Sequence, residues 1–409
     1  MASRALGSKL ATALASLVLT LLALEIVLRL GGVRAEIHRM PADRLNLPQP
    51  LEQTESVPYG FVAHAVMRTT YASDPRGYFG PGNSVDHRFN SAGWRDEERS
   101  IEKPQDTFRI LGLGDSYLFG QGVRHEDVCL TRLGELLRSR VGELRIETIN
   151  AGLRSMNTSQ ERDLLLHRGL RYDPDLVILH FVLNDVEKSA EDLFLRRPKV
   201  EFTEDYIEIF NTPDALSRIS RLWGWGRQRV LGKLRAEAYI QACLESFERD
   251  GGKWAQCRDA LADIARICRE RDLPLLVVIF PFFIDLDRDY PFQPIHDTVR
   301  GFCQSQGIPV LDLREAFRDF RGPELWVHPT DQHPNEIAHG IAAEAIAAYL
   351  GDHPELLRVR GPSDGGQGLE SAESRVRTPG RIVGPGADGS APLLTSAPGD
   401  ETFVPGRSR

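Results

Sequence analysis

The sequence has no excess of positive charge and few cysteines. Its 409 residues include 50 Lys and Arg against 58 Asp and Glu, a formal net charge of -8. Nucleic-acid binding needs a basic face, so this balance argues against a nucleic-acid partner. The five cysteines are an odd number without a Cys-x-x-Cys pair, so neither a zinc site nor a disulfide framework is indicated. We expect no metal or other cofactor, and buried free cysteines; the alternative is a Cys243–Cys257 disulfide in an exported domain.

Long hydrophobic runs are also scarce, and the one present covers residues 10–30. As a helix, these positions would reach about 30 Å, the thickness of the bilayer hydrocarbon. Glu25 and Arg29 interrupt its last third but are four residues apart and can pair. The sequence after the run is a poor cleavage site. We therefore predict a transmembrane signal anchor at 10–30 after a cytoplasmic segment at 1–9, with a cleaved signal peptide as the alternative.

The rest of the chain divides by composition. Residues 31–105 are rich in Pro, Gly, Asn and Asp without a long periodic segment, which indicates a stalk or a lead-in. Residues 106–355 alternate apolar runs with amphipathic stretches and form the main predicted domain. Residues 356–409 have too little apolar content to fold, so we predict a disordered tail.

Five apolar runs in the main domain, each followed by a helical pattern, predict a parallel sheet covered on both faces. The expected fold is α/β with three α/β/α layers. The strands are expected in the segments 108–115, 144–152, 175–185, 273–283 and 308–313. An insertion at about 187–233, which includes the aromatic run at 222–226, follows the third strand. It either caps the ligand-binding edge of the sheet or is a solvated excursion.

The first chemical signal is Gly112-Leu113-Gly114-Asp115-Ser116-Tyr117, at the end of the first strand. A dinucleotide loop would need a third glycine where Tyr117 stands and an acidic residue after the second strand, and both are missing. A serine at a strand-to-helix turn is instead well placed as a nucleophile. The alternative for Ser116 is a simple helix cap.

Three further signals follow at the ends of later strands. Gly152 closes the second strand, and Asn184 ends the third, where its amide could donate to a developing oxyanion. Asp331 and His333 precede the last helix. In extended backbone, residues two apart face the same side, so Asp331 could orient His333 to take a proton from Ser116. Each signal alone has an ordinary reading as a turn or a cap, but together they favour a catalytic site.

These residues resemble the four sequence blocks of the SGNH/GDSL hydrolases, over about residues 108–350. The resemblance implies a flavodoxin-like fold, with Ser116 as nucleophile and His333 as general base. It also implies an oxyanion hole made of the Ser116 N–H, the Gly152 N–H and the Asn184 amide. The lead-in segments 74–79 and 89–96 are similar to those of bacterial members with an N-terminal membrane anchor.

Two positions depart from the family pattern. Val182 stands where the family usually has glycine, which puts the pocket floor or the orientation of Asn184 in question. The family's acid usually precedes the histidine by three residues, where this chain has Thr330. Asp331, one residue closer, resembles the acid of some polysaccharide-acetylating relatives, and a Ser–His dyad is the alternative. His328 is a weaker rival for the base.

The sequence therefore predicts a membrane-anchored serine esterase or O-acyltransferase at the cell envelope, acting on an ester-bearing glycan or lipid such as an acetylated glycan. The alternatives are a non-catalytic scaffold that keeps the fold and a lipase-like enzyme at the inner membrane face. Arg4 and Lys9 favour a cytoplasmic N-terminus, whereas Arg29, Arg34, Arg39 and Arg44 lie at the other end of the run. We expect a periplasmic or extracytoplasmic catalytic domain.

Overall fold

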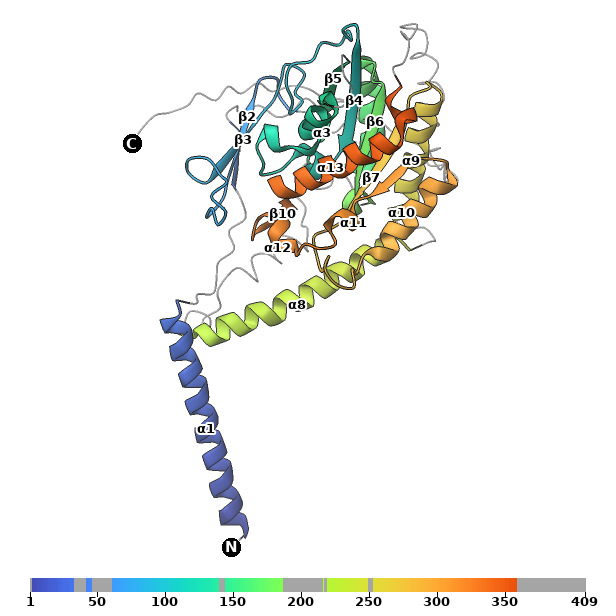
Figure 1. Cartoon of the computed structure of the whole chain (residues 1–409). Coiled ribbons are helices and arrows are strands. Elements are labelled where there is room, and N and C mark those ends of the chain that lie inside the picture. The colour runs from blue at the N-terminus through green and yellow to red at the C-terminus, as the bar shows by residue number, and fades with distance from the viewer. Residues whose placement is uncertain are drawn as a thin grey trace, which may run out of the picture. The chain divides into compact units, whose positions relative to one another are not determined.

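The computed structural model describes residues 2–32, 42–45, 61–139, 144–186, 216, 219–248 and 253–358 (Figure 1). The predicted tail at 356–409 lies outside these residues except for its first three, as does most of the predicted insertion before residue 216. The elements described below belong to one compact unit, Met1–Gly361.

A five-stranded parallel sheet forms the core, as the sequence predicts (Figure 1). The strand order is β5-β4-β6-β7-β8, so the order reverses at β4. In such sheets, ligands bind outside the carboxyl ends of the strands at the reversal. The bounds are β4 Thr107–Gly114, β5 Arg145–Asn150, β6 Leu176–Val182, β7 Leu275–Phe280 and β8 Val310–Asp312.

The strands form where the sequence is continuously apolar, because both faces of the sheet are covered. Every residue of β4, β6 and β7 is buried. Helices α3 and α13 pack together, and so do α4 and α9, while α10 contacts β8; Figure 1 shows α3 and α13 in front of the sheet. The bounds are α3 Cys129–Arg138, α4 Thr158–His167, α9 Lys253–Arg269, α10 Gln293–Ser305 and α13 Glu336–Asp352.

The remaining short elements connect this framework. They are α2 Ser116–Phe119, α11 Arg314–Phe317, α12 Gly322–Leu325 and the 3-10 helices η1 His125–Asp127, η2 Gly169–Tyr172, η3 Leu183–Val186 and η4 Pro354–Leu357. A two-stranded antiparallel hairpin, β9 Trp326–His328 with β10 Asp331–Pro334, precedes α13.

The predicted stalk or lead-in contains a small antiparallel sheet of three strands, in the order β1-β2-β3. These strands are β1 Ala42–Leu45, β2 Val66–Thr70 and β3 Ser84–Arg88. In β2 and β3 only alternate residues are buried, which gives a weaker sequence signal than the central strands. The small sheet packs with the main domain: Met67 of β2 and Phe89, directly after β3, cluster with Phe119 at the end of α2.

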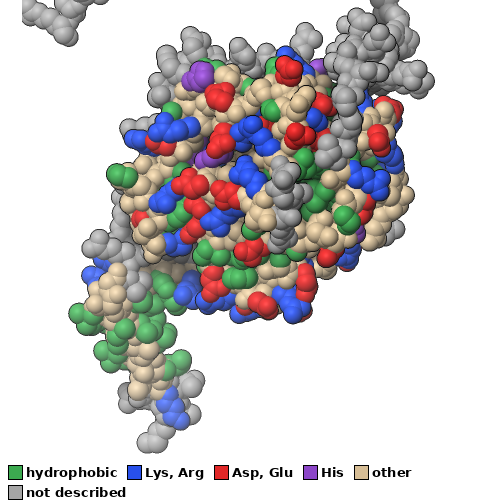
Figure 2. Space-filling model, turned by 45° about the horizontal axis from the view of Figure 1, so that its top comes forward, with side chains coloured by type: hydrophobic (Ala, Val, Ile, Leu, Met, Phe, Trp, Pro, Cys, Tyr) green, Lys and Arg blue, Asp and Glu red, His purple; other side chains and the backbone are tan. Residues whose placement is uncertain are grey.

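The apolar run forms part of helix α1, Ala2–Leu30. Its segment Lys9–Leu30 has a mean hydropathy of 2.3 and is long and apolar enough to cross a membrane; a signal sequence would pass the same test. Figure 2 shows hydrophobic side chains along this helix, whereas the visible face of the main body mixes acidic and basic side chains. The last turn of α1 contacts the start of α8, Arg221–Ser246.

Helix α8 is 26 residues long and includes the end of the predicted insertion at about 187–233. The first turns of α8 contact α1. Residues 187–215, the rest of the insertion predicted either to cap the sheet edge or to be a solvated excursion, lie outside the described part of the chain. All five cysteines are buried and free, which rules out the alternative of a Cys243–Cys257 disulfide in this structure.

Candidate active site

Ser116 lies directly beyond the carboxyl end of β4, where the strand order reverses. The chain turns there because the Asp115 side chain caps the short helix α2, accepting a hydrogen bond from the Tyr117 N–H at 2.8 Å. Gly120 ends α2 in a left-handed conformation (φ 78°), which glycine adopts without strain. This turn holds the Ser116 hydroxyl at the edge of the sheet that binds ligands in such folds.

His333 and Asp331 lie on β10, in the hairpin before α13. Extended backbone puts these two residues on the same side of the strand. Asn335 then begins α13, its side chain accepting hydrogen bonds from the N–H groups of Ile337 and Ala338. The cap fixes the end of the hairpin and thereby the position of His333.

The structure brings the three predicted catalytic side chains together. The His333 Nε2 atom is 2.9 Å from the Ser116 Oγ, and the His333 Nδ1 atom is 2.5 Å from the Asp331 Oδ1. Ser116 is 9% exposed and the His333 side chain 31% exposed, so the pair is enclosed but reachable from solvent. An imidazole between a hydroxyl and a carboxylate is the geometry of base-assisted nucleophilic attack.

The charges around His333 favour its role as a base oriented by a carboxylate. Burial lowers the pKa of His333, but the charge and hydrogen bond of Asp331 raise it more, so its pKa lies above the usual value. Burial raises the pKa of Asp331, but His333 and Tyr71 together lower it more, so this carboxyl remains ionised near neutral pH.

Tyr71 is a site residue that the sequence does not predict. Its hydroxyl donates a hydrogen bond of 2.8 Å to the second oxygen of Asp331, across 260 residues of sequence. The Tyr71 ring is stacked on Phe79, so the lead-in holds the Asp331 carboxylate, which the sequence predicts to be catalytic, from outside the main domain. His328, the rival base, instead has its ring nitrogens 3.0 Å from Ser73 Oγ and 2.8 Å from Thr330 Oγ1.

Replacing Tyr71 by phenylalanine should therefore impair both stability and turnover. A hydrogen bond to a charged group is worth about 1.5–3 kcal/mol, and we expect the free energy of unfolding to fall by this order and kcat to fall about tenfold. Urea unfolding and ester hydrolysis measure the two effects. Tyr78→Phe is the control, because the Tyr78 hydroxyl donates to Asp127, away from Ser116. An equal loss of kcat in both variants would contradict a positioning role for Tyr71.

The two predicted oxyanion-hole residues lie beside Ser116, but their donors are engaged. The Gly152 N–H donates to the Asn150 side chain at 2.9 Å, and the Asn184 amide donates to Asp115 at 3.0 Å. A side chain at Gly152 would come within 2.5 Å of the Phe119 backbone nitrogen, so glycine is needed for close packing against α2. An amide nitrogen carries two hydrogens, which leaves Asn184 a second donor.

Asp115 connects these groups and is a second residue without a predicted role. Its carboxylate accepts hydrogen bonds from the Asn184 amide and, at 3.3 Å, from the Ser116 hydroxyl. Burial raises the pKa of this carboxyl above its usual value. The hydroxyl of Ser116 is thus shared between Asp115 and His333, and the shorter contact is to His333.

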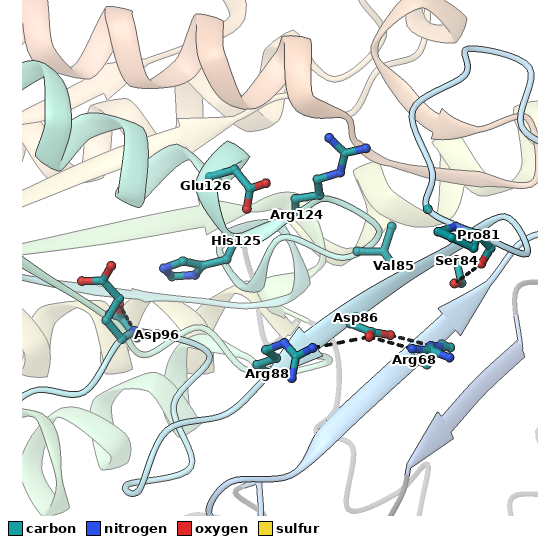
Figure 3. A pocket seen from close by; sticks show the side chains of 12 residues that line it. Arg68, Pro81, Ser84, Val85, Asp86, Arg88, Asp96, Arg124, His125 and Glu126 are labelled. Carbon is teal, nitrogen blue, oxygen red and sulfur yellow. Dashed lines mark hydrogen bonds and ion pairs between the residues drawn. The ribbon is translucent and has the colours of Figure 1, made fainter.

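A separate cavity of about 530 Å³ lies between the lead-in strands and the loop after α2 (Figure 3). Neither Ser116 nor His333 lines it. Three of its charged side chains pair with one another: Arg68 binds Asp86 through two nitrogens, and Arg88 reaches the same carboxylate, as Figure 3 shows. In the described part of the chain, no three His, Cys, Asp or Glu side chains gather as metal ligands.

The fold is an α/β fold with a flavodoxin-like order of parallel strands, and the contacts at the strand-order reversal have the geometry that serine hydrolases use. Residues 113–341, more than half of the chain, match the GDSL-like Lipase/Acylhydrolase family. The chain belongs to this family, as the resemblance in its four blocks predicts. A comparison with curated proteins finds no match.

Several solved structures are similar in fold at low identity. A two-domain esterase active on acetylated mannans is 13% identical with a TM-score of 0.38; the alignment covers 63% of this chain and 52% of that chain, about half its length. An acetyl-xylooligosaccharide esterase variant from Geobacillus stearothermophilus is 15% identical (62% and 97% covered, TM-score 0.38). TesA is 13% identical (60% and 98% covered, TM-score 0.38). Likenesses at this level say nothing about the substrate of this chain.

Proposed function

We propose that this chain is a membrane-anchored serine esterase or O-acyltransferase that acts on an ester-linked acyl group at the cell envelope. The observation that carries the proposal is the 2.9 Å contact between Ser116 Oγ and His333 Nε2 in a chain of the acylhydrolase family. The alternative of a non-catalytic scaffold expects these side chains to lie farther apart than one water could bridge, contrary to this distance.

In the proposed mechanism, Ser116 Oγ attacks the carbonyl carbon of the ester while His333 Nε2 accepts the hydroxyl proton. Asp331 holds the Nδ1–H and stabilises the imidazolium that forms. The tetrahedral intermediate collapses as His333 returns the proton to the leaving alcohol, which leaves an acyl-serine. Water, or the hydroxyl of a sugar acceptor, then attacks the acyl-serine while His333 takes its proton. The acyl–Oγ bond breaks as His333 passes that proton to Ser116 Oγ, which restores the enzyme.

The oxyanion of this intermediate would be stabilised by the Ser116 N–H and the second amide hydrogen of Asn184. The Gly152 N–H becomes a third donor only when the Asn150 side chain turns away, because that side chain accepts its hydrogen bond at 2.9 Å. Removing one such donor typically costs about 3 kcal/mol in the barrier. Substrate binding would have to trigger the change at Asn150.

The acyl group in this proposal is short, with acetyl as the first choice. Ser116 is 9% exposed, and the neighbouring Tyr117 ring lies 5.7 Å from the His333 ring and about 6 Å from Phe280 and Phe283. Val182, in place of the usual glycine, further limits the room. An enclosed nucleophile among aromatic rings has little space for a long chain.

The test is a series of p-nitrophenyl esters of increasing acyl length, hydrolysed by the full chain in detergent. We expect kcat/KM to be highest for acetate and to fall steeply toward decanoate, since a long chain meets the aromatic wall. A maximum of kcat/KM at decanoate would contradict the short-acyl proposal. Inactivity on every ester would contradict the proposal that the chain is an esterase. Release of acetate from acetylated xylan, with and without a glycan acceptor, then separates hydrolysis from transfer.

The anchor in this proposal is α1, whose segment Lys9–Leu30 has the length and hydropathy of a span. The predicted organisation, with an anchor at 10–30, a lead-in at 31–105 and a hydrolase domain at 106–355, belongs to the same proposal. A topology reporter fused after Arg409 would place the domain on one side of the membrane. We expect the reporter to be active on the periplasmic side. A cytoplasmic reporter would favour the alternative of a lipase-like enzyme at the inner membrane face.

A further inference from the structure

The first half of α8 exposes an apolar stripe. Trp223, Val230 and Leu234 are spaced seven and four residues apart, so they share one face of the helix. They are 49%, 61% and 55% exposed, and Ile219, just before the helix, is 70% exposed. Side chains of this size are seldom left in water in such a row, so the stripe indicates an interaction surface.

The same segment is strongly basic. Residues 215–236 contain six Lys and Arg and no Asp or Glu, in a chain whose net charge is -8. The Arg229 guanidinium lies 4.4 Å from the centre of the Trp225 ring, and Trp225 is itself 37% exposed. Tryptophan, basic side chains and an apolar face on one helix are typical of helices that lie in the interface of an anionic bilayer.

The start of α8 is bound to the last turns of α1. The Glu25 carboxylate accepts hydrogen bonds from the Arg221 and Leu222 N–H groups, both at 2.8 Å, and from the Ser220 hydroxyl. Arg29 donates to the Ile219 carbonyl at 2.6 Å. Glu25 precedes the end of the apolar helix by five residues, about 7.5 Å. If α1 crosses a bilayer with residues 10–30 in the hydrocarbon, α8 begins close to the boundary between the hydrocarbon and the headgroups, toward which the Arg29 side chain can extend.

A groove of about 1010 Å³ separates the two helices. Its lining is mainly apolar: Val18, Leu21 and Leu22 from α1, and Leu222, Trp223 and Val230 from α8. The apolar stripe of α8 is therefore continuous with the surface of α1 that would face lipid. The room between the helices suits lipid acyl chains, with the basic residues of α8 at the level of the headgroups.

We propose that the first half of α8 is an interfacial helix that binds the surface of a bilayer rich in anionic phospholipid, beside the anchor. This inference rests on the proposed anchoring of α1. The second half of α8 reaches the hydrolase domain, where Tyr239 lies 5.9 Å from Phe282, a neighbour of Tyr117. The helix thus ties the membrane surface to the aromatic wall beside Ser116.

The test uses the full chain in vesicles of equimolar phosphatidylglycerol and phosphatidylcholine with brominated acyl chains. Subtracting the fluorescence of the Trp223→Phe/Trp225→Phe variant from that of wild type gives the emission of these two tryptophans, because the variant keeps Trp94, Trp254 and Trp326. We expect the brominated lipid to quench most of this difference. Quenching should be weaker in pure phosphatidylcholine, where the electrostatic attraction is missing.

Charge reversal tests the basic face. Arg227→Glu/Arg229→Glu/Lys233→Glu should reduce the quenching with phosphatidylglycerol to the level in pure phosphatidylcholine. Arg258→Glu/Arg266→Glu on α9, whose side chains are 45% and 49% exposed, should leave it unchanged. An unquenched difference in a chain that floats with the vesicles would overturn the interfacial helix and leave the anchor intact.

Two other outcomes also count against the proposal. A chain that does not float with vesicles would refute both the anchor and the interfacial helix. The brominated lipid could also fail to quench the tryptophans while their fluorescence shifts as the protein-to-lipid ratio rises. That result would show that the stripe binds a second copy of the chain. Hydrolysis of p-nitrophenyl acetate in detergent is independent of either result, so failure here is distinguishable from failure of the proposed catalysis.

Discussion

Replacing Ser116 by alanine should abolish hydrolysis of p-nitrophenyl acetate, with a loss of roughly 10⁵- to 10⁶-fold in kcat. The hydroxyl at this position is the proposed nucleophile, and without it the His333 imidazole has no proton to accept at 2.9 Å. The remaining activity would come from the oxyanion donors and substrate binding alone. Initial rates at saturating ester, corrected for uncatalysed hydrolysis, measure the effect.

A matched control separates this loss from a failure to fold. Ser305→Ala removes a hydroxyl that binds the Phe302 carbonyl on the exposed end of α10, and it should leave kcat unchanged. Thermal unfolding of the Ser116 variant should resemble that of wild type, because its hydroxyl accounts for few contacts. Activity retained by Ser116→Ala would contradict the proposed nucleophile.

Replacing Asp331 by asparagine should lower kcat by about 10⁴-fold, as in other Ser–His–Asp sites, and shift the pH dependence of kcat/KM. The base must be neutral to accept a proton, so kcat/KM rises with pH through the pKa of His333. In the intact chain the Asp331 charge and hydrogen bond raise this pKa above its usual value of about 6.5, against the opposite effect of burial. Without the Asp331 charge, burial dominates and lowers the pKa of His333. The rise of kcat/KM with pH should therefore occur at lower pH, and its plateau should be lower.

Asp312→Asn is the control for this variant. The Asp312 Oδ1 atom lies 2.8 Å from the His296 Nδ1 atom, so Asp312 belongs to a second His–Asp pair that includes neither Ser116 nor His333. Its removal should affect stability but not the position of the acidic limb. A pH profile unchanged in Asp331→Asn would show that His333 works without this carboxylate, as the Ser–His dyad alternative predicts.

The sheet and the catalytic contacts could be expected from the sequence because their signals are local. The central strands are buried on both faces and read as continuous apolar runs, such as Leu275–Phe280. Parallel strands bring their carboxyl ends to one edge, which places Ser116 there, after β4. His333, 217 residues later, reaches the same edge from the antiparallel hairpin of β9 and β10, which the apolar pattern does not predict. The Asp331 position follows from the period of extended backbone.

The other site contacts leave no such local signal. The hydrogen bond from Tyr71 to Asp331 depends on how the lead-in packs, and a tyrosine directly after a short, half-buried strand carries no special signal in the sequence. The engagement of the Gly152 N–H by Asn150 depends on a side-chain rotamer, which a sequence does not specify. The sequence does not predict the full length of α8, because three glycines in it lower the helix propensity: Gly224, Gly226 and Gly232.

The most direct test of the account is to map the residue that reacts with a fluorophosphonate. The probe phosphonylates a serine only where a neighbouring base activates it, so peptide mass spectrometry after labelling reports nucleophile and base together. We predict one adduct, on Ser116, that disappears in His333→Ala although Ser116 is still present. An adduct on another residue, or an unlabelled Ser116 in active protein, would contradict the assignment of Ser116 as nucleophile and His333 as base, on which the proposed function depends.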